Sequence, residues 1–381
     1  MDFTIPEELR AIQEGVREFV NRRVEPLAQQ IEEEDRIPST LMEEAARMGL
    51  FGLSIPEEYG GLGLGVLGRV LVYEELGKSS NGFTSLIGAH TGIGSTGIVE
   101  MGSEDLKRKY LPDMAAGRRL AAFAITEPHA GSDAASIRTA AVKKGDRWIL
   151  NGQKQFITNG PEADIFTVIA VTDKSKGTRG ISAFVVEAGW KGVSKGAPDK
   201  KMGLRGSHTC QLFFDDVEVP EENLIGEEGM GYVAAMKILA KGRATLAARA
   251  VGTMEKLIRL CTAYAKERVS MGKPLAEHQL IQAYLAEMAV DHALSQTYTY
   301  KVAWMADQGM NIAKEAAIAK LFATEAFGRV ADKAVQIFGG MGYMREMEVE
   351  RAYRDARITR IYEGTSEIQK LIIAGRLLQE Y

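Results

Sequence analysis

The chain has 381 residues, a formal net charge of −4 and 45% hydrophobic residues, which is typical of a globular protein with two or three domains. The near-neutral charge offers no basic surface for nucleic acid, and no apolar run is long enough for integral membrane association. The two cysteines lie far apart in the sequence and predict neither a disulfide framework nor a metal site.

The N-terminal residues lack the basic and apolar regions of a signal peptide. We therefore expect a cytoplasmic protein. A processed mitochondrial matrix protein would show the same features, so that alternative stays open.

The first third of the chain is predicted to be helical, because apolar residues recur at helical spacing from Leu9 to Phe19. Further helices are expected at residues 41–50, 69–76 and 104–114. The pattern changes near Leu120, where short segments rich in β-branched and aromatic residues alternate with turns. These segments are residues 147–150, 164–171, 181–186 and 210–214. They predict a middle β domain, either a small barrel or a sandwich of antiparallel strands.

Long helices return after Pro220. Apolar stripes at residues 239–261, 281–288 and 322–337, together with a terminal helix, predict a four-helix bundle. The expected fold class is α+β. It comprises an N-terminal helical domain at residues 1–119, a β domain at residues 120–228 and the bundle at residues 229–381. With no low-complexity linker, the three parts are expected to pack as one rigid unit.

Two segments, residues 63–68 and 92–97, have the glycine spacing of a dinucleotide-binding loop. Neither follows a strand and opens a helix, as phosphate binding in a βαβ unit requires, so both are predicted to be structural. A nicotinamide-dependent enzyme is therefore not supported. The five histidines show no metal-ligand spacing, and no metal site is predicted.

Glu363 lies between Tyr362 and Gly364, where one local pattern ends and another begins. Gly364 predicts a turn, and the spacing of Ser366 and Gln369 is that of a capping box at the start of the last helix. A carboxylate fixed by such a turn is well positioned for chemistry. The local pattern alone equally fits a solvated surface acid.

A second candidate region follows the first predicted β segment. Thr126, Gly131 and Ser132 would present hydroxyls and exposed backbone amides, which suit an anionic or polar heterocyclic ligand. The alternative is a hairpin connection with Asx and Ser turns.

Three stretches together resemble the acyl-CoA dehydrogenase family. Residues 124–133 resemble its first signature, residues 336–343 its second, and residues 361–365 the stretch that carries its catalytic base. The helix–β–helix order agrees, and the resemblance covers essentially the whole chain. It implies FAD-dependent α,β-dehydrogenation of a fatty acyl-CoA to the trans-2-enoyl-CoA, the first step of β-oxidation.

The resemblance implies that Glu363 removes the α-proton while hydride passes to FAD. Some family members carry the base on a bundle helix instead, just before an arginine that matches Arg243. Here the preceding residue is Gly242, which has no side chain to act as a base. The other residues implied to contact substrate are Ser132, Arg243, Tyr362 and Gly364.

The resemblance also implies a set of FAD contacts. Within one subunit they are Phe123, Ile125, Thr126, Gly131, Ser132, Phe156, Ile157, Thr158, Thr365 and Glu367. Contacts to the FAD of a neighbouring subunit would come from Arg268, Ser270, Gln279, Gln336 and Gly340. Many relatives have phenylalanine where this chain has Met271, which leaves one aromatic cofactor contact in doubt. Sharing of FAD implies a homo-oligomer, with the family's tetramer expected.

The motifs around Gly88 and Lys201 are most similar to the long- and very-long-chain branch, without its C-terminal membrane-associating extension. We therefore expect medium-to-long straight acyl chains, with an electron-transfer flavoprotein as acceptor. Two alternatives remain. One is an oxygen-using acyl-CoA oxidase-like flavoenzyme, and the other is a non-catalytic fold relative that acts as a binding protein.

Overall fold

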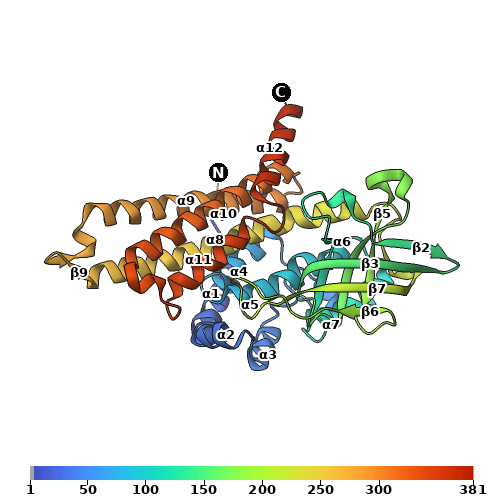
Figure 1. Cartoon of the computed structure of the whole chain (residues 1–381), viewed down its shortest axis with the longest axis horizontal. Coiled ribbons are helices and arrows are strands. Elements are labelled where there is room, and N and C mark those ends of the chain that lie inside the picture. Colours follow the sequence, from blue (N-terminus) through green and yellow to red (C-terminus); the bar gives the residue numbers. More distant parts are fainter. Residues whose placement is uncertain (1–3, 381) are drawn as a thin grey trace.

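A computed structural model describes residues 4–380 and confirms the helix–β–helix architecture (Figure 1). The N-terminal part consists of helices α1 (Glu7–Phe19), α2 (Ala28–Glu34), α3 (Ser39–Arg47), α4 (Val66–Leu76), α5 (Asn81–Gly88), α6 (Thr96–Met101) and α7 (Glu104–Ala115). The predicted apolar stripe of α1 is buried at Val16 and Phe19. Helix α5 continues into a π-helical turn, η4 (Ala89–Gly94), which packs against the β domain.

The middle part is one mixed sheet. Its strands are β1 (Ala121–Ala124), β2 (Ala140–Lys144), β3 (Arg147–Thr158), β4 (Ile165–Val171), β5 (Ile181–Glu187), β6 (Val193–Lys195), β7 (Thr209–Pro220) and β8 (Leu224–Ile225). Their order is β6-β7-β3-β2-β4-β5-β8, with β1 also beside β4. The predicted purely antiparallel arrangement is wrong at two places, because β1 and β2 both run parallel to β4. A long loop, not a tight hairpin, separates β1 from β2, so the chain can return in the same direction.

The C-terminal part contains α8 (Gly231–Glu267), α9 (Gln279–Asp307), α10 (Ala313–Phe338), α11 (Glu348–Thr359) and α12 (Ser366–Glu380). A hairpin of β9 (Val269–Ser270) and β10 (Lys273–Pro274) joins α8 to α9. The fourth helix in the bundle core is α11, which buries Val349 and Ala356, and not the terminal helix as expected. Helix α12 projects from the bundle in Figure 1, and its Leu378 is 84% exposed.

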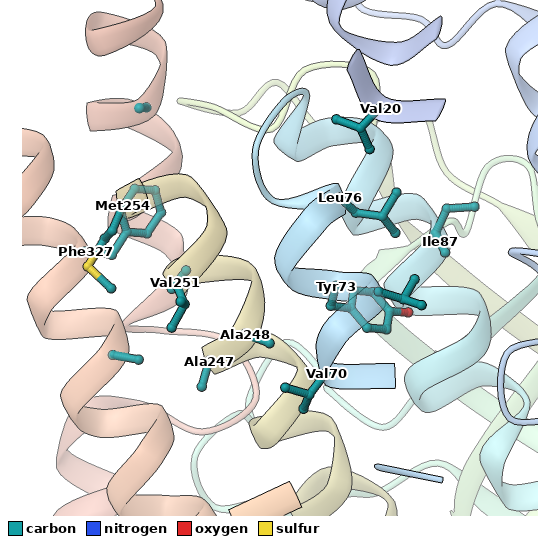
Figure 2. Packing of buried hydrophobic residues seen from close by; sticks show 14 of the residues in the cluster. Val20, Val70, Tyr73, Leu76, Ile87, Ala247, Ala248, Val251, Met254 and Phe327 are labelled. Atoms are coloured by element: carbon teal, nitrogen blue, oxygen red, sulfur yellow. The ribbon is translucent and has the colours of Figure 1, made fainter. Parts of the chain in front are cut away.

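The largest core joins the N-terminal helices to the bundle where α4 packs on α8 (Figure 2). Val70 of α4 lies beside Ala247 and Ala248 of α8 in this core, whereas Tyr73 points to the other side of α4, toward Ile87 of α5. The small alanine side chains let the two helices approach closely. At Gly252 the approach is closest, because a Cβ there would lie only 1.8 Å from Glu74 O.

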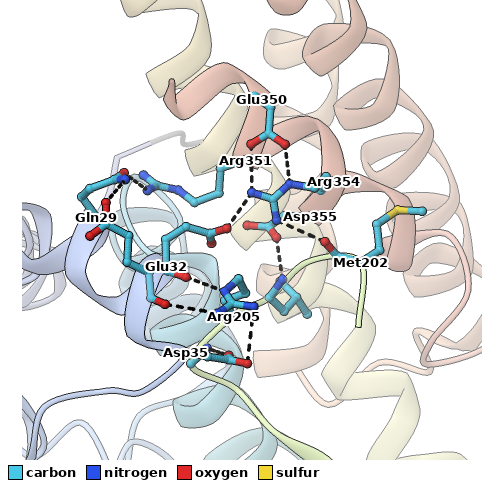
Figure 3. A network of polar contacts seen from close by, with 12 residues as sticks. Gln29, Glu32, Asp35, Met202, Arg205, Glu350, Arg351, Arg354 and Asp355 are labelled. Carbon is cyan, nitrogen blue, oxygen red and sulfur yellow. Dashed lines mark hydrogen bonds and ion pairs between the residues drawn. The ribbon is translucent and has the colours of Figure 1, made fainter. Parts of the chain in front are cut away.

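A polar network links all three parts (Figure 3). Arg354 of α11 contacts Glu32 of α2 at 2.7 Å and donates to Met202 O of the β domain at 3.1 Å. The next residue, Asp355, accepts a hydrogen bond from Leu204 N at 2.6 Å. One turn of α11 therefore ties the helical domain and the β domain to the bundle. Within residues 4–380, no helix is long and apolar enough to cross a membrane.

Candidate active site

Glu363 lies in an uncommon backbone conformation at the turn between α11 and α12. Its φ is +54°, and Gly364 follows with φ +90°. Left-handed backbone at a non-glycine residue needs support from its surroundings. The side chain of Gln369 gives that support by donating to Glu363 O at 3.1 Å and to Gly364 O at 2.9 Å. Lys320 Nζ donates to Gly364 O at 2.8 Å.

The expected capping box does not form at this turn. Ser366 Oγ donates instead to Glu325 Oε1 at 2.6 Å, and Thr365 Oγ1 accepts from Ile368 N at 3.3 Å. The cap is therefore Thr365, one residue earlier than expected. Gln369 is free to hold the carbonyls of the turn because no capping box engages it, and the spacing alone could not show which role it takes.

The carboxylate of Glu363 is shielded from solvent at one oxygen. Its Oε2 is buried and has no hydrogen-bond partner among the described residues. Burial raises the pKa of Glu363 above its usual value, while the positive charges of Lys320 and Arg243 oppose the shift. An unpaired, desolvated carboxylate with a raised pKa has the properties of a general base.

Two neighbouring residues of α8 fit around Glu363. Arg243 is 5% exposed, and its Nε is 3.4 Å from Glu363 O. A Cβ on Gly242 would lie 2.7 Å from Glu363 Oε2, closer than real Cβ contacts allow. Gly242 therefore does more than lack a side chain that could act as a base. It leaves the space that the carboxylate of Glu363 occupies.

Glu363 and Tyr362 line a cavity between the three parts of the chain. The remaining lining residues come from α4, α5 and η4, from the β domain, and from α8. They are Tyr73, Thr84, Ser85, Gly88, Ala89, Gly92, Ile93, Phe123, Ile125, Thr126, Phe156, Ile157, Thr158, Leu239, Gly242, Thr245, Leu246 and Arg249. Six of the expected cofactor-contact residues therefore lie on the same cavity as Glu363, as does Gly88.

The β-domain wall of this cavity comes from the end of β1 and a bulged part of β3. The register of β3 against β7 shifts between Lys154 and Ile157. This irregularity places Phe156 at φ +57° with 60% of its surface exposed. A bulge commonly redirects a side chain next to a functional site, and here it turns an aromatic ring outward.

The loop after β1 is held by a buried ion pair that the sequence analysis missed. Lys154 Nζ contacts Glu127 Oε1 at 2.7 Å and donates to Ile125 O at 3.0 Å. Glu127 also accepts from Arg138 N at 2.7 Å and Thr139 N at 3.0 Å. Burial lowers the pKa of Lys154 to about 8, against the opposing charge of Glu127. Gly131 and Ser132 lie on the exposed part of this loop and do not line the cavity.

The residues expected to reach the FAD of a neighbouring subunit do not line this cavity. Arg268, Ser270, Gln279, Gln336 and Gly340 are all exposed. They gather beside β9, where α8 and α10 end and α9 begins, at the end of the bundle opposite the sheet (Figure 1). Met271 is 93% exposed at the same hairpin. Thr365 and Glu367 are at the start of α12, just after the base.

Comparison with known proteins agrees with this architecture. Family models match in chain order, with the N-terminal domain of acyl-CoA dehydrogenase at residues 6–118, the middle domain at 122–217 and the C-terminal domain at 229–378. This chain belongs to the acyl-CoA dehydrogenase family. It is an oxidoreductase, as the resemblance implied.

Similar members of the acyl-CoA dehydrogenase family cover the full chain. A short-chain specific acyl-CoA dehydrogenase of Clostridium acetobutylicum is 42% identical over 100% of both chains. Butyryl-CoA dehydrogenase of Megasphaera elsdenii is 40% identical, with a TM-score of 0.96 over 99% of this chain and 100% of that one. A chain in a structure described as the electron transferring flavoprotein of Acidaminococcus fermentans is 40% identical, with a TM-score of 0.97 over 100% of both.

Acyl-CoA dehydrogenases use FAD, and the cavity residues of this chain suit that cofactor. Phe156 offers an exposed aromatic ring for a flat heterocycle, and Thr126 and Thr158 offer hydroxyls on the same wall. The orphaned Glu363 Oε2 completes the arrangement. When bound, FAD supplies the acceptor for the electrons that leave the substrate.

Proposed function

We propose that this chain dehydrogenates an acyl-CoA between its α- and β-carbons, with Glu363 as the base. The observation that carries the proposal is the buried and unpartnered Oε2 of Glu363 on a cavity that also contains the flavin-wall residues. The carboxylate takes the α-proton as the β-hydrogen leaves with its electron pair, and the carbon–carbon double bond forms. The backbone N–H of Glu363 is positioned by the turn to stabilise the enolate oxygen of the thioester.

The rest of the turn supports this role. Gln369 and Lys320 hold the two carbonyls, so the side chain of Glu363 does not move with a flexible loop. Arg243 packs against the same backbone and contributes a positive charge near the base. We infer that Tyr362 and Gly364 contact the substrate because they flank the base.

The names of the relatives favour a short acyl group over the medium-to-long chain that the motifs suggested. We place this chain with the short-chain dehydrogenases, acting on fatty acyl-CoA in β-oxidation. The expected electron acceptor is an electron-transfer flavoprotein.

We also propose a homotetramer in which the exposed cluster at the β9 hairpin reaches the FAD of a neighbouring subunit. The support is the position of that cluster at the end of the bundle opposite the sheet, whereas the cavity of the same chain includes residues of the sheet. A cytoplasmic location stays a proposal, which the bacterial source of these relatives supports.

The test is an anaerobic titration of the FAD-loaded protein with acyl-CoAs from four to sixteen carbons. We expect the flavin absorbance to bleach, with the fastest bleaching for short chains. A protein that binds no FAD, or that no acyl-CoA bleaches, contradicts the proposal and favours a non-catalytic relative. Rapid reoxidation by air would favour the oxygen-using alternative.

A further inference from the structure

Arg249 is a buried cation on the wall of the acyl cavity. It is 5% exposed and lies in α8 among otherwise small or apolar residues. Its Nε donates to Asn81 Oδ1 at 3.0 Å, which fixes one edge of the guanidinium group. Its Nη2 is buried and has no hydrogen-bond partner within residues 4–380. No described carboxylate forms an ion pair with this arginine.

Tyr362 presents a second unsatisfied group to the same cavity. Its Oη is buried and forms no hydrogen bond of ordinary geometry among the described residues, and it lies close to the guanidinium group of Arg249. Two other hydroxyls on the wall are already satisfied, because Thr84 donates to Leu76 O at 2.8 Å and Thr245 donates to Gly242 O at 2.9 Å. Arg249 and Tyr362 therefore retain the capacity to donate to a ligand, and leaving such buried groups unpaired costs free energy.

The position of Arg249 relative to the base indicates which part of a ligand it would meet. Gly242 touches Glu363 Oε2, and Arg249 follows Gly242 by seven residues on the same helix. This is two turns, or about 10 Å along the helix axis. Arg249 is thus on the same face of α8 as Gly242 and lines the same cavity. An acyl chain whose α-carbon lies at Glu363 and that runs along this face would meet Arg249 with its far end.

The charges around the cavity are not balanced. Among the described residues that line the cavity, Arg249 is the one cation and Glu363 the one acid, and Arg243 and Lys320 add positive charge beside Glu363. Asp355 accepts from Leu204 N at 2.6 Å and makes no ion pair with Arg249. A ligand carboxylate would give Arg249 the opposite charge that no described residue pairs with it.

We propose that Arg249 and Tyr362 bind a carboxylate at the far end of the acyl chain, so that the substrate is the CoA monothioester of a short dicarboxylic acid. This inference rests on the proposed dehydrogenation. A carboxylate matches a guanidinium in charge and geometry, and the tyrosine hydroxyl adds a second donor. A chain that ends in methyl would leave both groups unsatisfied.

The test uses acyl-CoA analogues in which sulfur replaces the β-carbon, because these lack the β-hydrogen and bind without turnover. Calorimetry compares a carboxylate-ended and a methyl-ended analogue of equal chain length on the FAD-loaded protein. We expect the carboxylate-ended analogue to bind about tenfold tighter or more. Arg249→Met should abolish or reverse this preference. Arg259→Met, at an exposed position of the same helix, should retain it.

Equal or tighter binding of the methyl-ended analogue by the unsubstituted protein overturns the inference, as does a preference that survives Arg249→Met. If Arg249→Met does not fold, the comparison of the two analogues on the unsubstituted protein decides alone. Failure of this inference can be distinguished from failure of the proposed dehydrogenase function. Bleaching by methyl-ended acyl-CoAs without preference for the carboxylate leaves the dehydrogenase intact, whereas no bleaching by either class contradicts both.

Discussion

Glu363 combines a strained backbone, a buried carboxylate oxygen and a neighbour without a side chain. The sequence predicted a turn at Gly364 but could not predict that Glu363 itself adopts φ +54°. That conformation depends on hydrogen bonds that the side chains of Gln369 and Lys320 donate to the carbonyls of the turn. The residues around Glu363 in the sequence do not indicate that these two side chains turn toward it. The resemblance to the family pointed to the base, and the cavity explains physically why a carboxylate there can act as one.

Gly242→Ala tests the space around the base. The added methyl would lie 2.7 Å from Glu363 Oε2 and 3.4 Å from Ile93 Cγ2, so the carboxylate must move. We expect the rate of flavin reduction to fall about tenfold or more while FAD remains bound. Gly328→Ala is the control, because its Cβ would meet nothing closer than 3.8 Å. Equal rates in both variants would show that the base tolerates displacement.

The raised pKa of Glu363 predicts a pH-dependent stability difference. Since burial raises the pKa in the folded state above the usual 4.5, the folded protein holds this proton more tightly than the unfolded chain does. Ionisation therefore weakens the fold as pH rises from about 4.5 through the folded pKa. Glu363→Gln cannot ionise, so its thermal midpoint should exceed that of the unsubstituted protein at pH 8, and the gap should shrink toward pH 5. A gap that widens on acidification would contradict the sign of the shift.

At the scale of elements, periodicity predicted the long helices and most strands but not their partners. The stripes of α8 and α10 were evident because they bury a continuous apolar face. Helix α11 was missed because its sequence is rich in charged residues, although its buried residues do recur at helical spacing. The parallel β1–β4 pair could not be predicted because strand direction depends on the path of the loop between β1 and β2.

Lys154→Met tests how the first signature loop is held. The variant would leave Glu127 buried with its backbone donors and His129, whose Nε2 is 3.5 Å from Glu127 Oε2, but without Lys154. Loss of one partner of a buried pair is strongly destabilising, so we expect the loop to loosen and FAD to be retained less well. The ratio of flavin to protein after gel filtration measures this. Lys143→Met removes an exposed ion pair of the same sheet and should leave that ratio unchanged.

For the whole molecule, the chain order of the parts was predictable and their mutual packing was not. The domain limits of 1–119, 120–228 and 229–381 stay a prediction. Some of the contacts that tie the parts together run between residues more than 150 positions apart, as from Arg354 to Glu32 and Met202. No local pattern in the sequence identifies such pairs.

Arg354→Met tests whether the three parts unfold together. The substitution removes the donors to Glu32 and Met202 and leaves Glu32 buried without its charge partner. We expect a loss of about 2–3 kcal/mol in stability and a thermal midpoint lower by several degrees. Arg357→Met, an exposed neighbour on α11, should change the midpoint little. Similar midpoints for the two variants would mean that the network contributes no stability.

The central claim is that Glu363 is the base for removal of the α-proton. The most direct measurement is the single-turnover rate of flavin reduction by a short-chain acyl-CoA in Glu363→Gln, with FAD content checked by absorbance. The amide keeps the shape of the side chain but cannot accept the proton. We predict a variant that binds FAD normally and reduces it at least about a thousandfold more slowly. A rate within tenfold of the unsubstituted protein would contradict the assignment.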